Sequence, residues 1–198
     1  MRSLITEPYW KSYGALTLTP VFTPEQCNII IKEGKSFQPQ SGQIAGDKKN
    51  EVNLNIRVST LSWIPYEHEP TKFMYKIIER DGKKANRNHF GFDEVCLNEE
   101  AQFTEYDGSQ GGHYDWHMDS PVVMKNEPPV RKISAIVLLS NPKDFEGGNL
   151  ELDTAGKKID LKQGYCFFFA SFLKHRLLPV TAGIRHSLVL WFGGQPFR

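Results

Sequence analysis

The sequence predicts a mainly β protein with flanking helices, an α+β fold whose core is a double-stranded β-helix (jelly roll). From residue 101 onward, short segments rich in Phe, Tyr, Val, Ile and Leu alternate with turns of Gly, Asn, Pro and Asp. This pattern is typical of two antiparallel sheets that face each other. Strands are expected near residues 101–107, 112–118, 131–140, 148–153, 156–161, 164–170, 176–181 and 184–192.

Two helices are expected in the first half of the chain, both packed on a sheet. Thr23, Pro24 and Gln26 have the pattern of a helix start, in which the Thr hydroxyl and the Gln side chain satisfy free amide groups. A second helix should begin near Pro70, where apolar residues recur at steps of three and four, and should end at Asp81-Gly82.

The length of 198 residues predicts one domain, 1–198. Within it, residues 1–100 would form helical and extended support and residues 101–198 the jelly-roll core. Residues 41–53 contain glycines and charges with little apolar periodicity, so they predict a loop, either a lid or substrate loop or a plain connector.

Composition narrows the classes of function and location. The formal net charge of +1 gives no field that would favour nucleic acid or an acidic membrane. The three cysteines show no disulfide or zinc spacing, and the start of the chain has no signal-peptide pattern. No apolar run is long enough to span a bilayer. We therefore expect a cytoplasmic protein with reduced thiols and neither a nucleic-acid nor a membrane partner.

His117, Asp119 and His175 form the candidate metal site. Side chains two residues apart on a strand point to one side, so His117 and Asp119 can reach one ion. Two imidazoles and one carboxylate on one face of a metal, with open positions, are the ligand set of non-haem iron(II) oxygenases. His113-x-Asp115 is a rival pair, expected to lie around the site or on the surface. Because only neutral imidazole binds metal, iron affinity should fall below pH about 6.5.

Arg185 is the candidate anchor for an acidic co-substrate. It follows His175 by ten residues, across a Pro/Thr/Gly connection, and a hairpin there would set the two side by side. A guanidinium grips a carboxylate through two hydrogen bonds. The alternative is a structural salt bridge. His186 should point to the opposite face of the strand.

These residues lie within a longer set of motifs. Tyr114 precedes His117 by three residues, and Gly147-Gly148 lies between the two halves of the metal site. Pro179 to Thr181, Gly183, Ser187 and Trp191 follow His175, and Arg57-x-Ser59 lies upstream. Together the motifs resemble the 2-oxoglutarate/Fe(II)-dependent dioxygenase superfamily, in its prolyl 4-hydroxylase-like branch. The resemblance is close from Phe103 to Phe192 and looser over residues 17–60.

The resemblance implies Fe(II), 2-oxoglutarate and O2 as cofactors and co-substrates, with ascorbate as a further ligand. It implies that His117, Asp119 and His175 hold the metal and that Arg185, Tyr106 and Ser187 bind 2-oxoglutarate. Leu138 stands where some members of the family have a second tyrosine.

Four further residues are candidate substrate contacts. For Arg57 and Arg131 the alternative is to cap the ends of the sheet, and for Trp191 it is to belong to the core, as Phe167 to Phe169 should. Tyr114 completes this group.

The resemblance implies hydroxylation of a peptidyl proline at C4, in a proline-containing peptide or protein, with succinate and CO2 as the other products. The first alternative is a hydroxylase of a free amino acid or another small molecule. Nucleic-acid dealkylation is a third possibility, but members of that branch have a second Arg six residues after the first, where this chain has Trp191. A non-catalytic cupin-like binding module would explain the strands, but not the combination of His117, Asp119, His175 and Arg185.

Overall fold

A computed structural model describes residues 14–42, 53–120, 129–153 and 158–196. Most of the predicted loop 41–53 lies outside these residues, as do the first ten residues, where no signal peptide was expected. Residues 156 and 157 of the predicted strand 156–161 lie outside them as well. The prediction of one domain remains a prediction.

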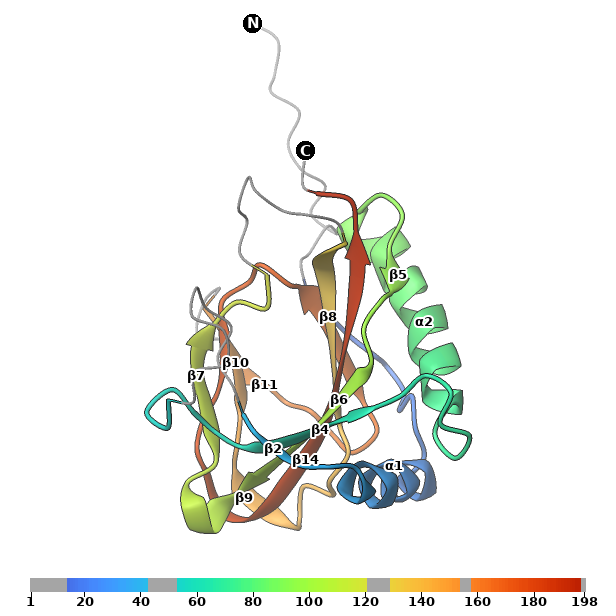
Figure 1. The fold of residues 1–198 in the computed structure, drawn as a ribbon. Coiled ribbons are helices and arrows are strands. Elements are labelled where there is room, and N and C mark those ends of the chain that lie inside the picture. Colours follow the sequence, from blue (N-terminus) through green and yellow to red (C-terminus); the bar gives the residue numbers. More distant parts are fainter. Residues whose placement is uncertain (1–13, 43–52, 121–128, 154–157, 197–198) are drawn as a thin grey trace, which may run out of the picture.

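Two antiparallel sheets face each other, which confirms the jelly-roll prediction (Figure 1). The nine-stranded sheet has the order β1 (Gly14–Leu16), β12 (Cys166–Ala170), β8 (Val130–Leu138), β14 (Val180–Gly194), β6 (Ala101–Asp107), β4 (Thr60–Ile64) and β2 (Gln40–Ser41), and β5 (Cys96–Leu97) and β9 (Phe145–Gly147) also pair with β14. The five-stranded sheet has the order β11 (Lys158–Ile159), β10 (Leu150–Leu152), β13 (His175–Leu177), β7 (His113–His117) and β3 (Arg57–Val58). Strands from before residue 101 thus extend both sheets.

The predicted hairpin that would place His175 beside Arg185 is wrong. β13 pairs with β10 and β7 in the small sheet, whereas β14 pairs with β6, β8 and β9. The segment expected to turn between them is the start of β14, where the register with β9 shifts between Val180 and Ala182 and where Gly183 has a φ of +69°. An irregularity of this kind bends a strand without ending it. His175 and Arg185 therefore belong to opposite sheets.

Both helices cover the side of the large sheet that faces away from β7 and β10 (Figure 1). α1 (Pro24–Ser36) begins as predicted, because the Thr23 hydroxyl accepts from the Gln26 amide while the Gln26 side chain accepts from the Thr23 amide. α2 (Phe73–Ala85) runs through Gly82, where the sequence predicted its end, into a π-helical segment, η1 (Asn86–Phe90). A Cβ on Gly82 would lie 2.1 Å from Phe192 Cζ, so this glycine allows α2 to approach β14 rather than ending the helix.

The buried apolar residues form two clusters, one on each side of the large sheet. Phe168 faces the helices and packs in a cluster with Ile30, Ile78 and Phe192. Phe167 and Phe169 belong to the cluster between the sheets. This alternation follows from the two-residue period of a strand. It confirms that the three phenylalanines are core residues.

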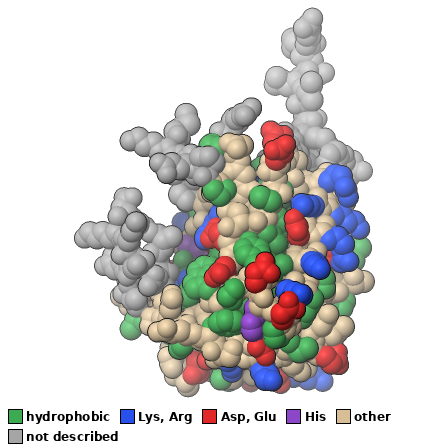
Figure 2. All heavy atoms as spheres, turned by 45° about the vertical axis from the view of Figure 1, so that its right-hand side comes forward, with side chains coloured by type: hydrophobic (Ala, Val, Ile, Leu, Met, Phe, Trp, Pro, Cys, Tyr) green, Lys and Arg blue, Asp and Glu red, His purple; other side chains and the backbone are tan. Residues whose placement is uncertain are grey.

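Surface features agree with the composition. Acidic and basic side chains both lie on the face shown in Figure 2, as a net charge of +1 suggests. The three cysteines are free. No helix in the described part of the chain combines the length and hydrophobicity needed to cross a bilayer.

Candidate metal centre

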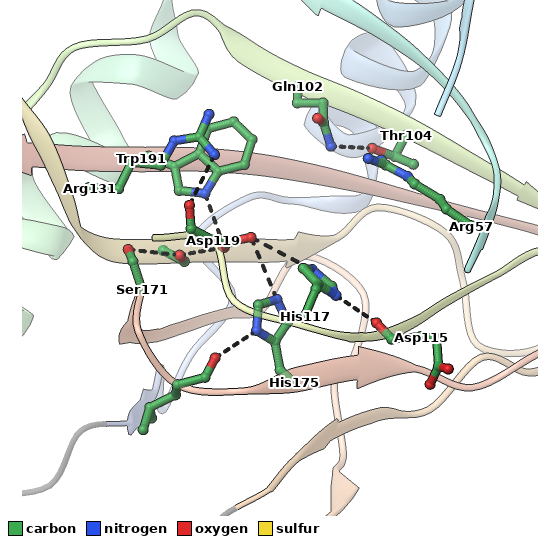
Figure 3. Close-up of polar contacts among 12 residues, drawn as sticks. Arg57, Gln102, Thr104, Asp115, His117, Asp119, Arg131, Ser171, His175 and Trp191 are labelled. Carbon is green, nitrogen blue, oxygen red and sulfur yellow. Dashed lines mark hydrogen bonds and ion pairs between the residues drawn. The ribbon is translucent and has the colours of Figure 1, made fainter. Parts of the chain in front are cut away.

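His117, Asp119 and His175 meet between the two sheets (Figure 3). One potential ligand atom from each lies within 4.8 Å of the others. The Nε2 atoms of His117 and His175 lie 3.6 Å and 3.7 Å from Asp119 Oδ1. Among the described residues this is the one group of three or more His, Cys, Asp or Glu donors close enough to share an ion.

Strand pairing and a backbone contact bring the three together. His117, the last residue of β7, is paired across the strands with His175, the first residue of β13. Asp119 lies just beyond β7, and its amide and that of Ser120 both donate to the Ser171 carbonyl at 3.0 Å. The alternation that the sequence predicted therefore continues past the end of the strand because Ser171 holds the backbone.

Both imidazoles are oriented by backbone carbonyls. His117 Nδ1 lies 2.8 Å from the Asp115 carbonyl, and His175 Nδ1 lies 2.9 Å from the Leu173 carbonyl. A carbonyl can only accept, so each Nδ1 carries a proton, and in the neutral ring Nε2 has its lone pair available for a metal. The donor set thus fits a divalent metal ion such as iron(II).

Asp119 is held through its other oxygen. Oδ2 accepts from Ser134 Oγ at 2.6 Å and from Trp191 Nε1 at 3.0 Å, and Ser171 Oγ lies 3.0 Å from Ser134 Oγ. Burial raises the pKa of Asp119, but His175, His117 and these two hydrogen bonds outweigh it and leave the pKa below its usual value. The carboxylate is therefore ionised, with Oδ1 directed at the histidines.

The surroundings of His117 keep its ring neutral. Burial, followed by the proximity of His175, lowers the pKa of His117 to about 4. The Tyr114 ring stacks on it with centroids 3.5 Å apart, and burial raises the pKa of Tyr114 to about 12. An uncharged imidazole beside an uncharged phenol is ready to bind metal at neutral pH.

Arg185 enters the same cavity from the large sheet. It is 3% exposed, and burial lowers the pKa of its guanidinium to about 10, which keeps it charged at neutral pH. Within the described residues it has neither an ion pair nor a hydrogen bond; its guanidinium carbon lies 5.9 Å from the centre of the Tyr106 ring. The structural salt bridge considered as an alternative is therefore absent from the described residues. A buried, charged guanidinium without an ion-pair partner among the described residues is suited to bind an acidic ligand.

A cavity of about 250 Å³ joins the two groups. Its walls include the three candidate ligands, Arg185, and the predicted co-substrate residues Tyr106 and Ser187. Tyr106 is the cross-strand partner of Arg185, and the neighbouring Ser187 is 2% exposed. The structure thus brings together all the residues predicted to bind metal or oxo-acid.

The predicted substrate residues Arg57, Tyr114, Arg131 and Trp191 also line this cavity. The Arg57 guanidinium carbon lies 4.5 Å from the Tyr114 ring centre, and its Nε donates to Ser59 at 2.8 Å.

At the other end of the group, Arg131 stacks 3.8 Å over Trp191 and binds Glu99 through two nitrogens. Trp191 is both a cavity wall and a buried side chain, at 4% exposed. The two interpretations offered for it from sequence are therefore not exclusive.

The remaining candidates near the metal-binding motifs lie outside the cluster of His117, Asp119 and His175. His113 is close to the Gly111 carbonyl at 2.8 Å, and the Asp115 side chain is exposed, so neither joins the cluster. Only the backbone carbonyl of Asp115 contributes, through His117. His186 faces away, as predicted, and contacts Glu105 and Ser140.

Sequence reasoning missed Ser134, Ser171 and Glu99. Ser134 and Ser171 are fully buried, and Ser134 shares the inward face of β8 with Ile136 and Leu138. A serine on an otherwise apolar inward face is a signal that could have identified it, because a buried hydroxyl needs a partner. Ser171 and Glu99 act across long distances in the chain and carry no comparable local signal.

Comparison with known proteins agrees with this geometry. The family model of the 2OG-Fe(II) oxygenase superfamily matches residues 101–193. A PKHD-type hydroxylase from Teredinibacter turnerae is 39% identical over 85 residues, which cover 41% of this chain and 38% of the relative. The match thus spans about two fifths of that relative's length.

Two solved structures are similar over most of their length. A viral collagen prolyl hydroxylase from Paramecium bursaria Chlorella virus-1, in its 2OG complex, is 21% identical with a TM-score of 0.71, covering 93% of this chain and 97% of that one. A prolyl hydroxylase from Trichoplax adhaerens, in complex with a peptide fragment of hypoxia inducible factor, is 20% identical with a TM-score of 0.74, covering 91% and 83%. At these identities the similarity shows a shared fold.

Proposed function

Because this chain belongs, through residues 101–193, to the 2OG-Fe(II) oxygenase superfamily, we propose that it is an iron(II)- and 2-oxoglutarate-dependent hydroxylase. One observation carries the proposal. Two imidazoles and an ionised carboxylate converge in a cavity that also contains a buried arginine with no acidic partner among the described residues. This pairing of a metal site with a carboxylate anchor suits an oxo-acid that binds both.

Each residue has a defined task in this function. His117, Asp119 and His175 hold the metal, and Arg185 binds the distal carboxylate of 2-oxoglutarate, with Tyr106 and Ser187 beside it. Bound iron(II), with 2-oxoglutarate and dioxygen, would supply the hydroxylation of a C–H bond, and succinate and carbon dioxide would be the other products. The walls of the cavity position the substrate and limit the access of water.

The proposed substrate is a proline-containing peptide, hydroxylated at C4 of the proline. Aromatic side chains line the cavity, with Trp63 and Trp191 at a centroid distance of 6.1 Å and Tyr114 on another wall. Such rings offer a large apolar surface against which a pyrrolidine ring can pack. The two similar structures named above are prolyl hydroxylases, one of them in complex with a peptide.

The first test is turnover of 2-oxoglutarate without substrate. With iron(II) present, wild-type protein should release succinate, and His175→Ala should not, because it lacks one of the three ligands. Equal turnover by both would contradict the proposal. His113→Ala is the matched control, since His113 lies outside the cluster, and its turnover should equal that of wild type.

The second test concerns the substrate. Peptides from a cell extract are incubated with the enzyme and examined by mass spectrometry for one added oxygen atom on proline. Oxygen added to a free amino acid instead would favour the small-molecule alternative and reject the peptide. Stimulation by ascorbate and a cytoplasmic location remain predictions, to be checked by adding ascorbate to the turnover assay and by cell fractionation.

A further inference from the structure

Arg185 lies between two cavities. It lines the 250 Å³ cavity of the metal centre and a second one of about 180 Å³, and Leu150 lines both. The walls of the second cavity include the apolar Leu138 and Leu161 and the polar Asn149 and Asp160. Arg185 therefore borders open space in the second cavity as well as in the cavity of the metal centre.

The aliphatic part of the Arg185 side chain packs closely against Gly148, whereas its guanidinium is not held by a hydrogen bond or an ion pair with described residues. Gly148 has a φ of +62°, and a Cβ there would lie 2.8 Å from Arg185 Cδ, so the missing side chain makes room for the stem. The guanidinium has no hydrogen bond or ion pair with described residues. Leu138 contributes only an apolar surface to the second cavity. The guanidinium can thus move toward the second cavity without breaking a hydrogen bond or an ion pair with described residues.

Open space beside Arg185 changes what length of co-substrate the site accepts. One extra methylene in a closed hydrophobic pocket costs about 1–3 kcal/mol, or about 10- to 200-fold in discrimination. That cost arises because neighbouring atoms must give way. Here the arginine can retreat into existing space, so most of the cost disappears.

We propose that this site also accepts 2-oxoadipate, the 2-oxo dicarboxylic acid with one methylene more than 2-oxoglutarate. The inference rests on the proposed function and deepens it by widening the class of co-substrate. Turnover would convert 2-oxoadipate and dioxygen to glutarate and carbon dioxide. One oxygen atom would enter the hydroxylated substrate and the other the new carboxylate of glutarate.

Isothermal titration of manganese-loaded protein with each acid tests the proposal without relying on activity. The expected dissociation constant for 2-oxoadipate is less than about tenfold above that for 2-oxoglutarate, below the range of a closed pocket. A larger ratio would overturn the inference and leave the proposed function intact. Failure of both acids to bind would overturn the proposed function, and this inference with it.

Filling the second cavity provides an independent test. Leu138→Phe places a larger ring there without adding a hydrogen-bond donor, and the ratio of the two dissociation constants should rise by about tenfold or more, because the arginine loses its space. Leu138→Ile keeps the volume and should leave the ratio unchanged. Leu161→Phe narrows the same cavity from another segment and replaces Leu138→Phe if that protein does not fold. An unchanged ratio in a folded cavity-filling variant would overturn the inference.

Discussion

Replacing Ser134 by alanine removes one of the two hydrogen bonds to Asp119 Oδ2, and we expect metal affinity to fall by about 10- to 100-fold. The hydroxyl donates at 2.6 Å to an ionised, buried carboxylate. A hydrogen bond to a charged group contributes about 1.5–3 kcal/mol, and each 1.4 kcal/mol is about tenfold. Without it, Asp119 rotates more freely and presents Oδ1 to the metal less often.

A competitive titration of metal-free protein with cobalt(II) measures the effect through the absorption of the bound ion. Trp191→Phe removes the other donor and should lower affinity by a similar factor, and the double variant should be weaker than either single one. Ser62→Ala is the matched control. Ser62 is also a buried serine, 3% exposed, but it donates to the Gly34 carbonyl in α1, away from the metal centre.

The result that would refute the reasoning is a Ser134→Ala protein that binds cobalt(II) as tightly as wild type. Equal losses in Ser134→Ala and Ser62→Ala would also refute it, because they would show a general effect of destabilisation. Thermal unfolding of each metal-free variant separates stability from affinity.

Four further predictions concern charge and packing. Folding lowers the pKa of His117 from 6.5 to about 4, so as the pH falls the unfolded chain binds this proton first; metal-free protein should lose stability between pH 6.5 and about 4, and a flat urea-denaturation midpoint over that window would contradict this. For the same reason, protonation of His117 should weaken iron binding only near pH 4, below the value of about 6.5 expected from a free histidine. Arg185→Lys loses the two-pronged grip on a carboxylate and should weaken 2-oxoglutarate binding by about tenfold or more in calorimetry, with cobalt(II) affinity unchanged; an equal loss of both would point to misfolding instead. Gly82→Ala should destabilise the protein by about 1–3 kcal/mol in urea denaturation because the new methyl group overlaps Phe192, whereas an increase in stability, usual for this substitution in an open helix, would show that the helix can shift.

Local sequence patterns predicted those parts of the site that depend on neighbouring residues. The two-residue period of a strand placed His117 and Asp119 on one side, and the same period turned His186 away from Arg185. The capping pattern at Thr23 fixed the start of α1 because its hydrogen bonds join residues three apart. The end of α2 was wrongly predicted, because Gly82 does not end the helix. It allows close packing against Phe192, more than a hundred residues later in the chain.

By itself, the sequence determined the jelly-roll class, the positions of most strands in the second half, and the identity of the four residues at the centre of the site. Only the tertiary structure decided that His175 and Arg185 come from opposite sheets, that Ser134 and Trp191 hold the Oδ2 atom of Asp119, and that Arg185 borders a second cavity. The physical reason is the separation along the chain of the residues that interact. Alternation and capping depend on bonds between near neighbours, whereas pairing partners, buried hydrogen bonds and cavities depend on which distant segments pack together.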